Sequence, residues 1–181
     1  MSAEPHLKAL CGRVLSFKED PRTAPDPGET YDYWEHGCVV IDGERIAIVG
    51  EAEAILPALS DAADISTFPN SLILPGFIDP HIHYPQTRVI ASYGTQLLGW
   101  LERFTFVEEQ KFLNPEHAHE AAVFFLDQLL SHGTTTASVY CTVHPSSVEL
   151  FFAEASARNL RMIAGKTMMD RNAPAELTDT A

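Results

Sequence analysis

Residues 72–86 decide the fold of this chain, and they read Leu-Ile-Leu-Pro-Gly-Phe-Ile-Asp-Pro-His-Ile-His-Tyr-Pro-Gln. The stretch begins as an apolar run of strand length and ends in two histidines one residue apart. Because side chains alternate between the faces of a strand, His81, His83 and Asp79 are expected on one face and Ile82 on the other. Two imidazoles that converge at the end of a buried strand form half of a metal site, since buried imidazoles need partners. For either histidine alone, a place in the core or in a loop is the simpler interpretation.

A second His-x-His, at His117 and His119, serves as a comparison. It falls within a predicted helix, where residues two positions apart point in nearly opposite directions and cannot share a ligand. We therefore expect His117 and His119 to be exposed surface residues, and His81 and His83 to be the metal pair.

A catalytic zinc site usually has three protein ligands and one open position, so two histidines are not enough. One further candidate is His132, although capping of a helix end is the simpler account of it. The other is His144, which follows a predicted strand at the end where parallel α/β sheets place their sites. Neither completes a convincing set of ligands.

The composition is that of an ordinary globular protein with an acidic surface. Of 181 residues, 45% are hydrophobic and 20% charged, enough for one domain or for a small domain plus part of another. The 12 basic and 25 acidic residues give a net charge of −13. Such a charge argues against a nucleic-acid backbone or an anionic membrane as the partner, because both would repel it.

The cysteines and the N-terminus bear on the cellular compartment. Cys11, Cys38 and Cys141 lie far apart and form no Cys-x-x-Cys motif, which favours a reducing compartment. The N-terminus lacks the long apolar core of a signal peptide, and no apolar run reaches membrane-spanning length. We therefore expect a cytoplasmic protein.

The N-terminal part of the chain predicts a small antiparallel β-module. The loosely alternating residues 9–17 predict a strand. Two apolar runs, 38–41 and 45–50, flank an Asp-Gly pair, the strongest short signal for a hairpin.

The connecting segments of this module predict less regular structure. Residues 18–37 are rich in Pro, Asp, Glu and Gly and predict a loop. The aromatic residues Tyr31, Tyr33 and Trp34 within it could form a binding patch, but covering a neighbouring edge is the favoured interpretation. Residues 51–68 predict a short helix and a second loop.

The rest of the chain alternates between helices and strands. Residues 97–112 predict a short helix followed by irregular chain. Asn114-Pro115-Glu116 predicts a helix start, and Gly133 predicts its stop after about His132. One apolar face of this helix consists of Ala122, Phe125, Leu126 and Leu129.

A strand is then expected over residues 134–141, a helix from about Pro145, and a strand over residues 160–167. The apolar face of that second helix consists of Val148, Phe151, Phe152 and Ala155. Strands and helices that alternate with connections of this length imply a parallel sheet.

Residues 75–83, Pro-Gly-Phe-Ile-Asp-Pro-His-Ile-His, resemble the first barrel strand of the amidohydrolase superfamily, metal-dependent hydrolases with a (β/α)8 barrel and a flanking β-module. More narrowly, the chain from about Ala9 onward resembles the guanine deaminase family. The motifs that carry this second resemblance are His83-Tyr84-Pro85-Gln86, Tyr93-Gly94, Leu97-Leu98-Gly99-Trp100-Leu101, Thr105-Phe106, Gly133-Thr134-Thr135-Thr136 and Gly165-Lys166-Thr167-Met168-Met169-Asp170-Arg171-Asn172-Ala173-Pro174.

The resemblance implies hydrolysis of guanine to xanthine and ammonia, one zinc ion per subunit with Fe2+ as a possible substitute, and a homodimer at full length. His81 and His83 would hold the metal, whose Lewis acidity makes hydroxide available near neutral pH. The substrate-contacting residues that it implies are His83, Tyr84, Pro85, Gln86 and Trp100. Gln86 has a carbonyl and an amide that could read the edge of a purine, or it is simply a polar turn residue. Trp100 could wall the flat base or pack in the core.

The expected fold class is α/β. A partial (β/α)8 barrel of about the first three βα units would occupy residues 74–181, preceded by the β-module of residues 1–73 as part of a composite β-sandwich. A whole barrel takes about 250 residues, more than this chain has. The late aspartate, the glutamate proton shuttle and the further histidines of the family have no place in this sequence, so its catalytic residues stay unknown. The alternatives are a deaminase of another aminated heterocycle and a catalytically inactive truncated chain.

Overall fold

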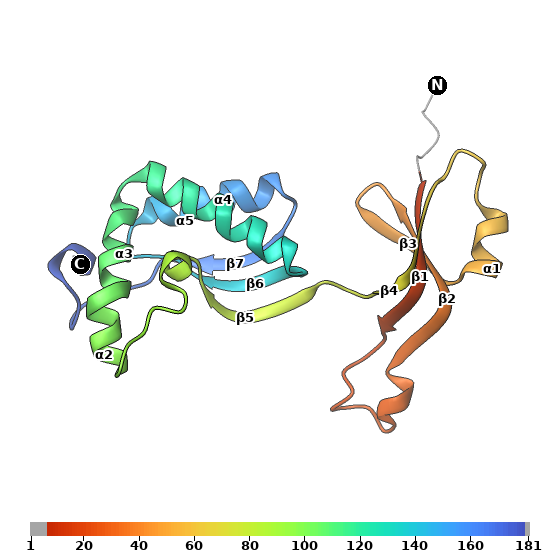
Figure 1. Cartoon of the computed structure of the whole chain (residues 1–181), viewed down its shortest axis with the longest axis horizontal. Helices are drawn as coiled ribbons and strands as arrows, with labels where there is room; N and C mark the ends of the chain where they lie inside the picture. The colour runs from red at the N-terminus through yellow and green to blue at the C-terminus, as the bar shows by residue number, and fades with distance from the viewer. Residues whose placement is uncertain (1–6, 180–181) are drawn as a thin grey trace. The chain divides into compact units, whose positions relative to one another are not determined.

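The structure is a computed structural model that describes residues 7–179, without the side chain of Pro27. The chain divides into two compact units, Met1–Pro75 and Gly76–Ala181 (Figure 1). This division lies two residues beyond the boundary expected between residues 73 and 74.

The first unit is a four-stranded sheet with a small core. Its strands are β1 (Leu7–Phe17), β2 (Tyr31–Asp42), β3 (Arg45–Glu51) and β4 (Asp64–Ile73), in the order β3-β2-β1-β4. The remaining elements are the 3-10 helices Pro27–Glu29 and Leu56–Ala58 and the short helix α1 (Ala52–Ile55). The predicted hairpin is confirmed: β2 and β3 pair antiparallel, and Gly43 in the turn has a φ of 59°, which glycine adopts without strain.

The loop expected over residues 18–37 is partly wrong, because residues 31–37 belong to β2. They pair antiparallel with β1, with Tyr33 opposite Leu15. The acidic residues in this segment suggested a loop, but one face of an antiparallel sheet can meet solvent, and Tyr31 and Tyr33 are accordingly 44% and 48% exposed.

The second loop of this unit is also partly wrong. Residues 64–68 begin β4, which runs parallel to β1, so the module is a mixed sheet and not a purely antiparallel one. Most residues of β4 are exposed, and the strand therefore lacks the clear alternation of apolar and polar residues by which a half-buried strand is recognised.

The second unit is a three-stranded parallel sheet with helices on one face (Figure 1). The strands are β5 (Phe77–His83), β6 (Thr134–Tyr140) and β7 (Arg161–Gly165), in that order. The two long helices are α4 (Pro115–Ser131) and α5 (Pro145–Ala157). The 3-10 helices Tyr84–Val89 and Ala175–Leu177 complete the unit, together with the helical segment described below. The predicted parallel βαβ arrangement is confirmed.

The predicted limits of α4 are confirmed. The Asn114 side chain accepts a hydrogen bond from the Glu116 backbone N–H at 2.9 Å, and Gly133 follows the helix with a φ of 82°. The four residues of its predicted apolar face are all buried. On α5, Phe151 and Ala155 are buried, but Phe152 is 38% exposed, so its assignment to the apolar face is wrong.

The segment between β5 and α4 is more regular than predicted. It consists of α2 (Leu97–Trp100), a π-helix (Leu101–Thr105), α3 (Phe106–Glu109) and a 3-10 helix (Gln110–Leu113). The irregular chain expected after a short helix within residues 97–112 is therefore wrong. Thr105 and Val107 lower helix propensity, but burial of Thr105 and Phe112 supplies packing that propensity does not contain.

The sheet of the second unit is open, and one of its faces has no cover within the described residues. Leu72 and Ile73 end β4, so the apolar run at residues 72–78 is not one buried strand. Ile78 of β5 is 72% exposed and Ile163 of β7 is 66% exposed.

No helix within residues 7–179 is both long and apolar enough to cross a membrane.

Candidate metal centre

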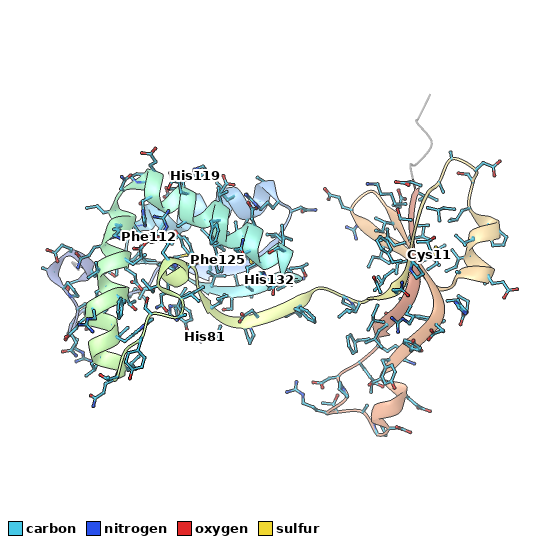
Figure 2. The ribbon with its side chains drawn as sticks, in the orientation of Figure 1. Cys11, His81, Phe112, His119, Phe125 and His132 are labelled. Atoms are coloured by element: carbon cyan, nitrogen blue, oxygen red, sulfur yellow. The ribbon has the colours of Figure 1, made fainter. Side chains whose placement is uncertain are left out.

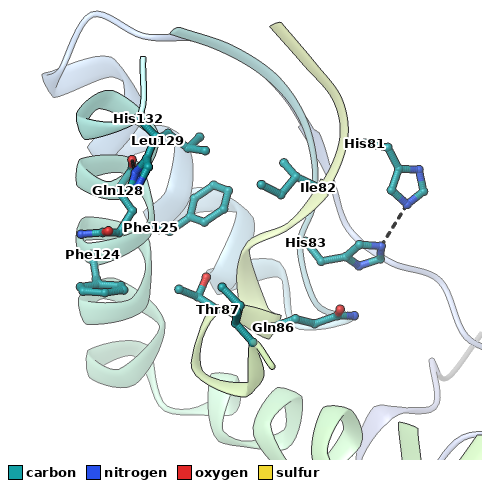
Figure 3. Close-up of a pocket in the computed structure, with 11 residues that line it drawn as sticks. His81, Ile82, His83, Gln86, Thr87, Phe124, Phe125, Gln128, Leu129 and His132 are labelled. Atoms are coloured by element: carbon teal, nitrogen blue, oxygen red, sulfur yellow. Dashed lines mark hydrogen bonds between the residues drawn. The ribbon is translucent and has the colours of Figure 1, made fainter. Parts of the chain in front are cut away.

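The C-terminal end of β5 carries the two predicted metal ligands. His81 and His83 lie on one face of the strand, and their Nε2 atoms are 3.3 Å apart (Figure 3). Ile82 points to the other face and packs against the hydrophobic core. The alternation of strand side chains thus brings the two ring nitrogens together, although His81 is exposed and His83 only half-buried.

This separation fits two ligands of one metal ion. Nitrogens at about 2.0–2.1 Å from a tetrahedral zinc ion lie about 3.4 Å from each other. A hydrogen bond between one protonated and one free ring nitrogen has a similar length. Burial, and to a lesser degree the nearby His81, lowers the pKa of His83. The lowered pKa favours the neutral imidazole, which is the form that binds a metal.

Tyr140, the last residue of β6, packs against both imidazoles. Its ring lies 4.7 Å from that of His83 with an interplanar angle of 13°, and 4.9 Å from that of His81. The contact restricts the orientation of both rings. Sequence reasoning missed Tyr140, although alternation along β6 places it on the face opposite the buried Ala137 and Val139.

Asp79 does not complete the site. Its Oδ1 accepts a hydrogen bond from the backbone N–H of His81 at 3.0 Å. Within residues 7–179, no group of three or more His, Cys, Asp or Glu side chains could hold a metal ion. The donor set on this chain is therefore partial, and it consists of two imidazoles.

A groove of about 600 Å3 opens beside the histidines, between the edge strand β5 and α4 (Figure 3). His81, His83, Gln86 and Thr87 line one side of it. The other side consists of α4 side chains, with Phe125 and Leu129 among them. The two imidazoles lie on the side of β5 away from α4, whereas the α4 side chains lie on the side to which Ile82 points (Figure 3).

The structure does not bring the other residues predicted to bind substrate into this groove. Tyr84 is fully buried, and its hydroxyl donates a hydrogen bond to the carbonyl of Ser147 at 2.9 Å. Pro85 is buried beside it. The indole N–H of Trp100 donates to the carbonyl of Ser92 at 3.0 Å, and Trp100 is not among the residues that line the groove.

Sequence reasoning missed a buried acidic residue near Gln86. This residue is Glu109, the last residue of α3, and the nearby Gln86 amide acts to lower the pKa of its carboxyl. Glu109 is only 6% exposed, and its burial, the larger effect, raises the pKa of the carboxyl to about 7. A glutamate in a short helix gives no sequence signal of this burial.

The helix-borne pair behaves differently from the strand pair. His117 Nε2 lies 3.0 Å from Glu108 Oε1, and His119 Nε2 lies 2.8 Å from Glu154 Oε1. Figure 2 shows His119 on the outer side of α4 and His81 on the side of β5 that faces away from the helices. As predicted, the two histidines share no ligand, but exposure of both is wrong. His117 is 13% exposed, because the buried Glu108 carboxylate draws it inward.

The other two candidate ligands, His132 and His144, differ in whether they line the groove. His132 ends α4 with its Nδ1 2.8 Å from the carbonyl of Gln128, as expected of a capping residue, and it lines the far end of the groove. His144 does not line the groove. Its Nε2 is buried and has no hydrogen-bond partner within the described residues. Burial and the nearby Lys166 lower the pKa of His144.

A parallel α/β sheet with an imidazole pair at the carboxyl end of one strand fits the class of metal-binding α/β proteins. Comparison with known proteins narrows this class. The model of the amidohydrolase family matches residues 72–181. Guanine deaminase of Escherichia coli strain K12 is 45% identical over the whole of this chain, which spans 41% of that relative's length.

Solved structures agree. The chain superimposes on E. coli guanine deaminase with a TM-score of 0.89 and 42% identity, covering 96% of this chain and 40% of the other. For a guanine deaminase from C. acetobutylicum with guanine in its active site, the TM-score is 0.76 and the identity 28%, covering 96% and 39%. The chain belongs to the amidohydrolase family, and its α/β fold is part of a barrel that the described strands do not close. It spans about two fifths of the length of the relatives that it matches.

Proposed function

We propose that the protein that contains this chain hydrolyses guanine to xanthine and ammonia, with water as the co-substrate. The observation that carries the proposal is the pair of Nε2 atoms 3.3 Å apart at the end of β5. The 45% identity to a guanine deaminase over the whole chain supports the substrate.

We infer that the resident metal is one zinc ion per subunit, with Fe2+ as the alternative. His81 and His83 would hold it through Nε2, and the remaining ligands come from outside the described donor set. When bound, the ion supplies Lewis-acid activation of water. The two imidazoles fit this role because their Nε2 atoms converge at the end of β5 and the Tyr140 ring packs against both of them.

The groove gives the chain its part in substrate binding. Gln86 presents a carbonyl oxygen and an amide N–H beside His83, and both can bond to the edge of an oxopurine. Trp100 is a second candidate for contact with the base, and this assignment rests on the resemblance alone.

Two metal ligands do not make a catalytic zinc site, so residues 1–181 alone should not turn guanine over. The cytoplasm is the proposed location, which the three free and buried cysteines support. A homodimer of the full-length protein is proposed from the resemblance alone.

The test is an assay of the full-length gene product. Xanthine formation from guanine is followed before and after treatment with a chelator, and again after zinc or Fe2+ is added back. An adenine derivative, cytosine and a triazine serve as competing substrates. Activity on guanine that is lost with the metal and restored by it supports the proposal. A metal-loaded protein that deaminates one of the other heterocycles and not guanine overturns it.

The substrate contact is tested separately with Gln86→Ala. If Gln86 reads the purine edge, KM for guanine rises roughly tenfold or more, because one good hydrogen bond in a binding site is worth about 1.4 kcal/mol. Gln96→Ala is the matched control, since Gln96 is exposed and does not line the groove. An unchanged KM for guanine in Gln86→Ala would mean that Gln86 does not contact the base and that other residues bind it.

A further inference from the structure

Tyr84 follows His83 directly in the sequence, but the two side chains lie on opposite faces of the sheet. The His83 imidazole lies on the side of β5 away from α4 (Figure 3). Tyr84 is fully buried in the hydrophobic core on the helix-covered side. The resemblance implied that Tyr84 contacts the substrate, whereas its place in the core indicates a role that does not depend on touching a ligand.

The Tyr84 ring packs among three aromatic rings from different helices. Its centroid lies 5.3 Å from that of Phe112 with an interplanar angle of 79°, 5.2 Å from that of Phe151 and 5.9 Å from that of Phe125. Edge-to-face and tilted pairs at these distances are favourable. A phenylalanine could make the same contacts, so the hydroxyl group of Tyr84 needs an explanation of its own.

The Tyr84 hydroxyl joins a buried hydrogen-bond network at the carboxyl end of β6. It donates to the carbonyl of Ser147, a fully buried residue in the first turn of α5, at 2.9 Å. The Ser147 hydroxyl in turn donates to the carbonyl of His144 at 2.7 Å and accepts from the hydroxyl of Thr142 at 2.9 Å. Because buried hydrogen bonds are costly to break, this network ties the end of β5 to the chain that follows β6.

The bond from Tyr84 also determines where His83 lies. One planar peptide unit connects the two residues, so an anchored Tyr84 leaves the main chain of His83 little freedom. The Tyr84 carbonyl accepts a hydrogen bond from the Thr87 hydroxyl at 2.7 Å, which fixes the start of the following 3-10 helix. The main chain is therefore held at the point where β5 ends.

On the opposite face of the sheet, the ring of Tyr140 holds the His83 imidazole. Tyr140 is the residue of β6 that pairs with His83 in the β5–β6 register. Its ring is stacked on that of His83 at 4.7 Å with an interplanar angle of 13°, and it lies 4.9 Å from the ring of His81. These contacts are made by the ring of Tyr140 and not by its hydroxyl.

We propose that Tyr84 and Tyr140 are positioning residues that hold His83 at two points. The Tyr84 hydroxyl fixes the main chain of His83 from the core, and the Tyr140 ring fixes its imidazole from the other face. An imidazole already held in its binding orientation loses less conformational entropy when a metal ion binds. The inference rests on the proposed function, because the metal that His83 would bind is the one proposed for that site.

The experiment measures zinc affinity in the full-length gene product by competition with a chromophoric chelator. The variants are Tyr84→Phe, Tyr140→Phe and Tyr140→Leu. Tyr84→Phe and Tyr140→Leu should each weaken zinc binding roughly tenfold, the lower end of the effect known for outer partners of metal ligands. Tyr140→Phe should stay within about twofold of the parent, because it keeps the ring. The same substitution thus has opposite outcomes at the two tyrosines.

A control variant separates positioning from a purely structural role. The Thr167 hydroxyl donates to the carbonyl of Cys141 at 2.6 Å, a hydroxyl–carbonyl bond like that of Tyr84 but just beyond β7. Thr167→Val should lower the urea midpoint of unfolding, as Tyr84→Phe does, and leave the zinc affinity unchanged. A lowered midpoint with unchanged zinc affinity in Tyr84→Phe overturns the proposal. Equal zinc affinities of Tyr140→Phe and Tyr140→Leu overturn it as well.

Hydrogen exchange of the zinc-free protein tests the same inference without metal or substrate. The backbone of residues 81–87 should exchange roughly tenfold faster in Tyr84→Phe than in the parent, because local opening becomes easier, and at the parent rate in Thr167→Val. If exchange and zinc affinity change as expected but guanine is not deaminated, only the proposed function is wrong. If guanine is deaminated and neither quantity changes in Tyr84→Phe, only the positioning role is wrong.

Discussion

The two His-x-His pairs of this chain have the same spacing in sequence and opposite behaviour in space. His81 and His83 lie on a strand, and their Nε2 atoms are 3.3 Å apart. His117 and His119 lie on α4, where each has its own carboxylate partner, Glu108 and Glu154. The comparison teaches that spacing becomes meaningful only with the period of the element, which is two residues for a strand and 3.6 for a helix.

The largest expected effect is a loss of metal and of activity when a histidine of the strand pair is replaced, but not when a histidine of the helix pair is replaced. In the full-length gene product, His83→Ala should lower both the metal content and kcat/KM for guanine, the latter by more than roughly 100-fold, since even the outer partners of metal ligands are worth 10–100-fold. His119→Ala is the matched control and should leave both close to the parent values. Metal analysis and steady-state kinetics measure the two. Comparable losses in the two variants would break the comparison.

The second prediction concerns the neighbouring acids of α3, of which only Glu108 contacts the helix pair. Burial raises the pKa of Glu109 from 4.5 to about 7, so the folded state binds more protons than the unfolded state between these values. The stability that depends on this proton is present below pH 4.5 and is lost as the pH rises through 7. The difference corresponds to roughly 3 kcal/mol.

Urea unfolding of the parent and of Glu109→Gln from pH 5 to pH 8 measures this loss. The variant has no carboxyl to titrate at this position, so its free energy of unfolding should fall less over that range. Parallel pH profiles would show that Glu109 titrates as an exposed acid does.

The third prediction concerns how much the contacts of His117 and His119 contribute to the stability of the fold. His117→Ala removes one partner of the buried Glu108 carboxylate and should lower the free energy of unfolding by about 1–3 kcal/mol. His119→Ala removes an exposed pair with Glu154 and should change it by less than about 0.5 kcal/mol. Denaturant midpoints of the two variants measure the difference. Equal midpoints would mean that the Glu108 contact does not stabilise the fold.

The smallest effect tests the start of the helix that carries this pair. Asn114→Ala removes the side-chain oxygen that accepts from the Glu116 N–H and should destabilise the protein by about 1 kcal/mol. Thermal unfolding of this variant beside Asn114→Ser, which keeps a capping oxygen, provides the check. A loss of similar size in both variants would point to a cause other than the cap.

Features that depend on local periodicity could be predicted from the sequence. The alternation along β5, the limits of α4 and the Asp-Gly hairpin are each contained within a few consecutive residues. The strand pair of histidines, and its separation from the helix pair, follow from the same local rule.

Features that depend on distant partners could not be predicted. Residues 31–37 form a strand because β1 pairs with them, and β4 runs parallel to β1 through a connection that no short motif specifies. Tyr140 meets His83 only through the β5–β6 register, and Glu109 is buried only because α3 packs against the 3-10 helix Tyr84–Val89. In both cases the contact lies between segments far apart in the sequence.

The most direct test of the central claim is the 15N spectrum of the histidine side chains of the full-length gene product as zinc is added. The account predicts that the Nε2 resonances of His81 and His83 shift together with one equivalent of zinc, and that those of His117 and His119 do not move. Zinc-dependent shifts at His117 or His119 with His81 and His83 unmoved would contradict it.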